Sequence, residues 1–198
     1  PREHGHLILP MVDELMAEAG LALPQLDALA FGRGPGSFTG VRMATGVIQG
    51  LALAANLPVA PVSTLAALAQ QAVSQHPQQT IYAALDARMS EVYWCQYTVQ
   101  DGVLVARGEE SVIAPDAVRV EQGHDAIGIG HGWRTYTKEL TEAVSAKNLT
   151  LWVDSLPRAK EVAQLAANIV LKGETVVAEN ALPVYLRDNV AKKKAQQK

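Results

Sequence analysis

Residues 29–56 read LAFGRGPGSFTGVRMATGVIQGLALAAN, and this stretch predicts a strand, a glycine-rich turn and a long helix in succession. The strand is expected over residues 28–31 and the helix from about Gly40. Four glycines and one proline within residues 32–40 fix an unusual backbone path, because only glycine takes positive φ at low cost. We expect Ser37 or Thr39 to cap the free N–H groups of the helix. The residues to which we assign a structural role in the turn are Gly34, Pro35, Gly36, Ser37, Thr39 and Gly40.

The helix after the turn is apolar over almost its whole circumference. Its polar residues fall on one narrow stripe at helical spacing, namely Arg42, Thr45, Gln49 and Asn56. Small residues recur at every fourth position, Gly46, Gly50 and Ala54, and form a smooth ridge that another helix can approach closely. Two interpretations follow: the helix is buried inside its own domain, or it packs on its own sheet and on a second protein chain.

Composition restricts the class of protein. The 198 residues are 48% hydrophobic and 19% charged, which is typical of a globular protein. A net charge of −3 offers no global attraction to nucleic acid, and the single cysteine, Cys95, suits a reducing cytoplasm. No signal peptide is visible, and no apolar run is expected to reach the ~18 residues of a membrane span. Residues 51–62 come nearest to such a run.

The first part of the chain alternates between helices and strands. Apolar residues recur at i, i+3 and i+4 over residues 7–19, which predicts an amphipathic helix with Pro10 near its first turn. A short strand is expected over residues 57–62, followed by a helix that Ser63 caps. This order favours a layered α/β domain with parallel strands.

The pattern changes after the polar stretch at residues 74–79, which we interpret as a boundary. Strands are expected on either side of a tight turn at residues 88–90, and Asp101-Gly102 predicts a second hairpin turn. Further along, we expect Asp154-Ser155-Leu156-Pro157 to cap a helix. The chain is thus predicted to comprise a first α/β lobe (1–77), a second α/β lobe (78–190) and a lysine-rich tail (191–198).

Two ligand-binding hypotheses are weak. The glycine-rich turn lacks the lysine of a phosphate-binding loop, and its glycine spacing does not fit a dinucleotide fingerprint. His4 and His6 are joined by no metal-binding motif, and solvated histidines explain them better. We therefore predict no cofactor and no metal.

Catalytic groups are also incomplete. Asp86, Arg88 and Glu91 share one hairpin, where they could do acid–base chemistry, but we favour a turn in which both carboxylates pair with Arg88. Cys95 lies between aromatic residues with no activating base, and Ser37 lacks the surroundings of a hydrolase nucleophile. We assign no catalytic residue.

Four motifs in order resemble the bacterial TsaB family, also called YeaZ. They are Gly32-Arg33-Gly34-Pro35-Gly36-Ser37-Phe38-Thr39-Gly40-Val41-Arg42, then Val62-Ser63-Thr64-Leu65, then Ala84-Leu85-Asp86-Ala87-Arg88 with Glu91-Val92-Tyr93, and Pro183-Val184-Tyr185-Leu186-Arg187. The resemblance implies a two-lobed actin-like (ASKHA) α/β fold. It also implies a first lobe that lacks its N-terminal strands, since family members begin with a strand pair that this chain does not have.

The resemblance further implies a partner. TsaB proteins pair with TsaD, the catalytic subunit that attaches threonylcarbamoyl to N6 of the adenosine beside the tRNA anticodon, and the ATPase TsaE joins them. The first helix and the helix after the glycine-rich turn build the pairing surface, which also supports homodimers. The resemblance therefore implies that the following residues of this chain form the partner interface: Leu7, Met11, Leu15, Arg42, Met43, Gly46, Val47, Gly50 and Ala54.

The function implied is that of a non-catalytic, cytoplasmic scaffold for TsaD, which contacts tRNA only indirectly and no membrane. A glycoprotease-like peptidase that acts on TsaD and an ATP-binding actin-like lobe are the alternatives. Tail lysines from Lys192 onward could touch RNA phosphates, although such a run is usually solvated.

Overall fold

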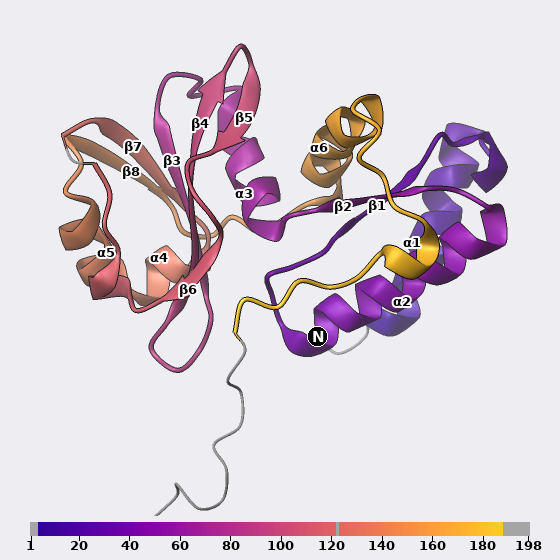
Figure 1. Ribbon diagram of the computed structural model, residues 1–198, viewed down its shortest axis with the longest axis horizontal. Helices are drawn as coiled ribbons and strands as arrows, with labels where there is room; N and C mark the ends of the chain where they lie inside the picture. The colour runs from indigo at the N-terminus through magenta and orange to yellow at the C-terminus, as the bar shows by residue number, and fades with distance from the viewer. Residues whose placement is uncertain (1–3, 122, 188–198) are drawn as a thin grey trace, which may run out of the picture. The chain divides into compact units, whose positions relative to one another are not determined.

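The strand–turn–helix–strand predicted around the glycine-rich turn is present in the computed structural model, which describes residues 4–121 and 123–187 (Figure 1). Strand β1 (Leu29–Gly32) is followed by helix α2 (Phe38–Ala55) and strand β2 (Val59–Val62). The two strands are parallel, with Leu29 opposite Val59 and Gly32 opposite Val62. A long crossover between parallel strands requires such a helix, so the local pattern alone sets this unit.

The chain divides into two compact units. Unit 1 comprises Pro1–Ala67 and Pro157–Pro183, and unit 2 comprises Leu68–Leu156 and Val184–Lys198. This division differs from the single boundary that the sequence predicted near residue 77, and it returns residues 157–183 to unit 1. The predicted tail at 191–198 lies outside the described residues.

In unit 1, helices cover both faces of the β1–β2 sheet. On one face, Phe31 and Val59 pack against Ile48 and Ala52 of α2. On the other face, Ala60 and Val62 pack against the apolar side of helix α6. The elements of unit 1 besides these strands and α2 are α1 (His4–Ala19), η1 (Leu23–Gln25), the start of α3 (Thr64–Val73), α6 (Ala159–Leu171) and η3 (Ala178–Asn180).

The contacts of helix α6 account for the difference from the predicted boundary. Val162, Leu165 and Ile169 lie on one side of this helix and pack against Ala60 and Val62 of β2. The helix also starts later than expected. Arg158 occupies its N-terminal cap position, and Asp154 forms an ion pair with Arg134 instead of capping it.

Unit 2 is built on a six-stranded mixed sheet in the order β5-β4-β3-β7-β8, with β6 also paired to β4. The hairpin turn predicted at Asp101-Gly102 is confirmed, and both residues have positive φ (51° and 76°), as a tight hairpin requires. The elements of unit 2, besides the end of α3, are β3 (Thr80–Asp86), β4 (Val92–Gln100), β5 (Val103–Ala106), β6 (Ser111–Ile113), η2 (Pro115–Ala117), β7 (Asp125–Ile129), α4 (His131–Thr135), α5 (Thr137–Val144) and β8 (Asn148–Trp152).

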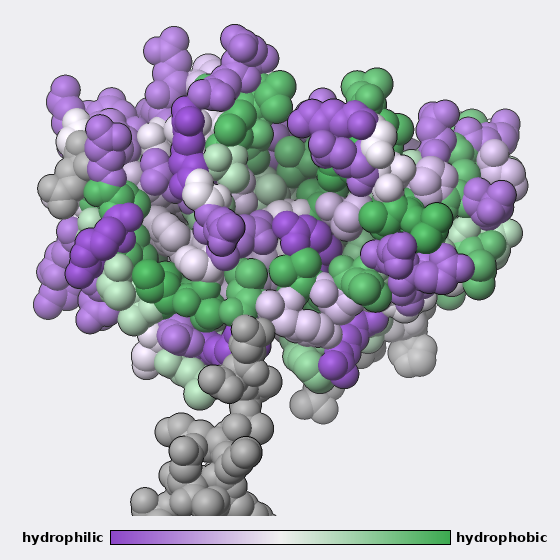
Figure 2. Space-filling model, in the orientation of Figure 1, coloured by the Kyte–Doolittle hydropathy of each residue, from purple (hydrophilic) through white to green (hydrophobic). Residues whose placement is uncertain are grey.

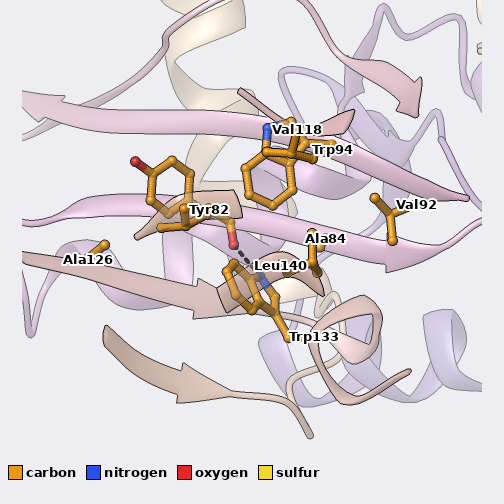
Figure 3. Close-up of a cluster of buried hydrophobic side chains, with 9 residues drawn as sticks. Tyr82, Ala84, Val92, Trp94, Val118, Ala126, Trp133 and Leu140 are labelled. Atoms are coloured by element: carbon orange, nitrogen blue, oxygen red, sulfur yellow. Dashed lines mark hydrogen bonds between the residues drawn. The ribbon is translucent and has the colours of Figure 1, made fainter. Parts of the chain in front are cut away.

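Aromatic side chains form the core on one face of this sheet (Figure 3). The Tyr82 ring stacks on Trp94 at 5.3 Å between ring centroids, and Trp94 lies 5.9 Å from Trp133. The buried Trp133 donates a hydrogen bond from Nε1 to the Tyr82 carbonyl oxygen at 2.9 Å. Burial of the Tyr82 phenol, with a smaller effect of the Glu121 charge, raises its pKa to about 12.

Candidate partner-binding surface

Helix α2 is fixed at its start by the glycine-rich turn. The Gly40 N–H donates to Ser37 Oγ at 3.1 Å, so Ser37 is the cap that the sequence left open between Ser37 and Thr39. A Cβ on Gly40 would lie 2.7 Å from this oxygen, which explains the glycine at this position. The turn is tied to the next motif, because the Thr64 N–H donates to the Gly34 carbonyl oxygen at 2.9 Å. The turn therefore holds the helix in a defined direction.

The middle of the polar stripe of α2 turns inward, whereas Arg42 and Asn56 at its two ends are exposed. Thr45 is buried against the rest of unit 1, and Gln49 donates from Nε2 to the Ala181 carbonyl oxygen at 3.2 Å. The inward face is completed by Val41, Ile48 and Ala52. Because Thr45 and Gln49 turn inward, the small and apolar residues on the opposite side of the helix are left exposed.

The exposed side of α2 carries the predicted ridge. Gly46, Gly50 and Ala54 are exposed, and no atom lies within 4 Å of a Cβ built on either glycine. Leu53 is 69% exposed beside them. At the start of the helix the Arg42 guanidinium lies 3.8 Å from the centroid of the exposed Phe38 ring. Leu53 and Phe38 were not among the predicted interface residues, although a helical wheel places Leu53 beside Gly50.

Helix α1 adds a second exposed apolar face. Leu7, Met11 and Leu15 are 49%, 58% and 60% exposed, at positions spaced by four residues. The helix begins beside α2, since a Cβ on Gly5 would lie 3.3 Å from Met43 Cε. Pro10 lies inside α1 and not at its first turn as expected. Figure 2 shows apolar side chains interspersed with polar ones on the visible face of unit 1.

We call this set of residues the α1–α2 surface: Leu7, Met11, Leu15, Phe38, Arg42, Gly46, Gly50, Leu53 and Ala54. Two further predicted interface residues, Met43 and Val47, are half-buried beside it. The other predicted interface residues on α1 and α2 are exposed, and their role in binding a partner stays a prediction.

The hydropathy of α2 corrects one expectation. Its 18 residues have a mean hydropathy of 1.2, so by length and composition the helix could cross a membrane, whereas no run of this length was expected from the sequence. Only 22% of the helix is buried inside the structure. The apolar character of α2 thus exceeds what its contact with the β1–β2 sheet requires.

The hairpin side chains and the cysteine considered as catalytic groups take part in ion pairs or are buried. Asp86 lies 3.5 Å from the Arg88 guanidinium, as predicted, but Glu91 pairs with Arg187 and not with Arg88. Cys95 is buried, and this burial raises the pKa of its thiol, which makes it a poor nucleophile. Within residues 4–121 and 123–187, no three His, Cys, Asp or Glu side chains are grouped to hold a metal ion. The side chains of His4 and His6 lie outside this description.

Comparison with known proteins defines the class of this molecule. The family described as "TsaD: tRNA N6-adenosine threonylcarbamoyltransferase" matches residues 1–195, which defines a TsaD-related protein. Proteins named tRNA threonylcarbamoyladenosine biosynthesis protein TsaB are 45% identical in Haemophilus influenzae and 42% identical in Escherichia coli. These alignments cover 98% of this chain and 84% and 85% of the two relatives.

A solved structure agrees with the sequence relatives. YeaZ from Pseudomonas aeruginosa matches with a TM-score of 0.86 and 47% identity, covering 94% of this chain and 85% of that one. The chain belongs to the TsaB family. The α/β fold of actin-like type expected from the sequence is confirmed by this match.

Proposed function

We propose that this chain acts in the biosynthesis of threonylcarbamoyladenosine in tRNA as the non-catalytic partner of TsaD, and that it binds TsaD through the α1–α2 surface. The observation that carries the proposal is the exposure of apolar residues on two adjacent helices. Leu7, Met11 and Leu15 on α1 and Leu53 on α2 expose more apolar side chain than a solvated helix pair needs. The names of the relatives supply the pathway.

The geometry of α2 supports a helical partner. Gly46 and Gly50 lie one turn apart on the exposed side with open space above each. Two helices can approach closely where such small residues face each other, and close approach increases the number of van der Waals contacts. Two apolar helix faces are sufficient for a stable interface of roughly 1,600 Å² in total.

The same surface is used in each assembly that we propose for this chain. Without TsaD, a second copy of this chain covers the surface and forms a homodimer. With TsaD, a one-to-one pair forms, TsaE joins it, and tRNA is bound by the complex in the cytoplasm and not by this chain alone. The net charge of −3 supports the last point, because it provides no general attraction to RNA.

The test is a substitution that fills the ridge. Gly50→Leu places a side chain in open space, so the isolated chain keeps its fold, while a closely packed helix cannot be accommodated. We expect pairing with TsaD to weaken by roughly 10- to 100-fold, since overpacking costs about 1–3 kcal/mol. Light scattering on size-exclusion fractions, with and without TsaD, measures the pairing.

A matched control is Ala163→Leu, which adds the same side chain to an exposed position of α6. It should pair with TsaD as the natural sequence does. Threonylcarbamoylation of tRNA by the reconstituted proteins should follow the pairing in each variant. Normal pairing by Gly50→Leu would show that the α1–α2 surface is not the binding site.

A further inference from the structure

The turn between β3 and β4 has an unusual backbone. Arg88, Met89 and Ser90 have φ values of 62°, 56° and 59°, so three successive residues other than glycine are left-handed. Each such residue is disfavoured because its Cβ approaches the following carbonyl oxygen. A run of three therefore persists only where surrounding contacts hold it.

Local contacts account for part of this hold. The Arg88 N–H donates to Asp86 Oδ1 at 2.8 Å, and the Glu91 N–H donates to the Arg88 carbonyl oxygen at 3.1 Å. The Ala87 N–H donates to the Glu91 carbonyl oxygen at 2.9 Å and closes the turn. All of these groups lie within six residues, so they form and break together with the turn.

A distant residue supplies the remaining hold. Arg187 lies 96 residues after Glu91 and forms an ion pair and hydrogen bond with its carboxylate. Arg187 Nη2 also donates to the Arg88 carbonyl oxygen at 3.2 Å, and Nη1 lies 3.5 Å from Met89 Sδ. One guanidinium thus contacts three residues in and beside the turn. Its planar set of donors suits this geometry, which a lysine could not reproduce.

The partial burial of the pair makes it consequential. The Arg187 side chain is only 14% exposed, whereas the Glu91 side chain is 35% exposed and its charge is partly screened by solvent. The cost of breaking the pair therefore falls mainly on the Arg187 guanidinium, which would lose its charged partner and its hydrogen bonds together. Arg187 follows closely after Val184, where the chain returns from unit 1 to unit 2.

We propose that Arg187 is a latch, which fastens residues 184–187 to the β3–β4 turn and keeps Arg88, Met89 and Ser90 left-handed. Opening of the latch releases the segment and relaxes the turn in one coupled step. Arg187 is a positioning residue and acts through Glu91 and the Arg88 carbonyl group. The latch joins two motifs that are far apart in the sequence, Asp86-Ala87-Arg88 and Tyr185-Leu186-Arg187.

Trypsin reports on the latch directly. Cleavage after Arg88 requires an extended backbone around the scissile bond, which the left-handed turn does not offer. Proteolysis follows the population of the open form when opening is fast relative to cleavage. Loss of charge-assisted hydrogen bonds in Arg187→Gln should therefore accelerate cleavage after Arg88 by roughly tenfold or more. Exchange of the Glu91 amide hydrogen should accelerate in parallel, since its acceptor is the Arg88 carbonyl oxygen.

Three variants separate the latch from general stability. Glu91→Gln keeps the shape but removes the charge, so a smaller acceleration is expected. Arg187→Lys keeps the charge without the planar donors and should resemble Arg187→Gln. Arg134→Gln breaks another ion pair of unit 2, with Asp154, and should leave cleavage after Arg88 unchanged.

Cleavage after the exposed Arg107 serves as the internal reference for unfolding of unit 2. The proposal is supported if Arg187→Gln and Glu91→Gln accelerate cleavage after Arg88 more than cleavage after Arg107. It is overturned if both sites accelerate equally in both variants, or if neither does. Because TsaD is absent from this experiment, its result is independent of the proposed partner role.

Discussion

The indole of Trp133 lies directly against the backbone of Gly128, so that a Cβ on Gly128 would be 2.5 Å from Trp133 Cε2. Gly128 is opposite Tyr82 in the parallel β3–β7 pairing, and Trp133 donates to the carbonyl oxygen of that same Tyr82. The glycine therefore creates the space in which the tryptophan contacts two neighbouring strands.

Gly128→Ala should destabilise unit 2 by about 1–3 kcal/mol, because a methyl group displaces a fully buried ring that has no free volume to enter. Leu151 Cδ2 would lie only 2.8 Å from the same Cβ, so this side chain would have to shift as well. Denaturant unfolding followed by tryptophan fluorescence measures the change. An unfolding free energy equal to that of the natural sequence would contradict the packing described here.

Gly46→Ala and Gly50→Ala should each stabilise the isolated chain by up to about 1 kcal/mol. Both glycines lie inside α2 with no atom within 4 Å of a Cβ, so the substitution only restricts the unfolded chain and improves helix propensity. Thermal unfolding by circular dichroism is the measurement, with Gly128→Ala as the opposite case. The measurement is made on the monomer, at a concentration below that at which the homodimer forms, and a loss of stability there would contradict the open space above the α2 ridge.

Ser37→Ala should destabilise unit 1 by about 1 kcal/mol, since the N–H of Gly40 loses its acceptor at the start of α2. Thr39→Ala is the matched control. Thr39 is exposed within the first turn, so its removal should change the unfolding free energy by less than ~0.5 kcal/mol. Equal effects of the two substitutions in urea unfolding would argue against Ser37 as the cap.

His131 should make stability depend on pH below neutrality. Burial lowers the pKa of its imidazole below 6.5, the Asp86 charge opposes this shift, and the charges of Arg88 and Arg134 reinforce it. The unfolded chain therefore binds this proton first. As the pH falls through 6.5 towards the lowered pKa of the folded state, stability is lost, and it returns as the pH rises.

The measurement is the unfolding free energy of the natural chain and of His131→Asn as a function of pH. The pH is varied over about 1.5 units on either side of the usual histidine pKa of about 6.5. Asparagine keeps an acceptor for the Asp86 N–H, which donates to His131 Nδ1 at 3.2 Å. The variant should lack the part of the decline that His131 causes. Identical pH profiles for the two chains would refute this assignment, and an NMR titration of the imidazole would locate the pKa itself.

Local features were predictable from the sequence because their physical causes are local. The β1–α2–β2 succession, the Ser63 cap of α3 and the Asp101-Gly102 turn each depend on residues within a few positions of one another. The motifs were also sufficient for the family resemblance, which the comparisons confirm. The exposed positions on α1 and α2 followed from spacing, although Leu53 and Phe38 were missed.

The predictions were wrong where a side chain interacts with a partner distant in the sequence and not with a neighbouring residue. Asp154 was expected to cap α6, but Arg134 provides a charged partner from another element. Glu91 was assigned to Arg88, its neighbour in the turn, whereas Arg187 reaches it from the end of the described chain. The sequence did not indicate an intramolecular partner for Gln49 of α2. Its side chain donates to the carbonyl oxygen of Ala181, a residue that follows η3 and is distant in the sequence.

The sequence by itself determined the helices, the strands, the turn chemistry and the membership of the TsaB family, since these depend on short-range sterics, periodicity and ordered motifs. Only the tertiary structure decided that residues 157–183 return to unit 1, that Thr45 and Gln49 of α2 turn inward, and that Arg187 contacts the β3–β4 turn. Each of these depends on which distant surface a residue meets. Burial and charge pairing between segments are properties of the packed chain, and no local pattern encodes the choice between two chemically equivalent partners.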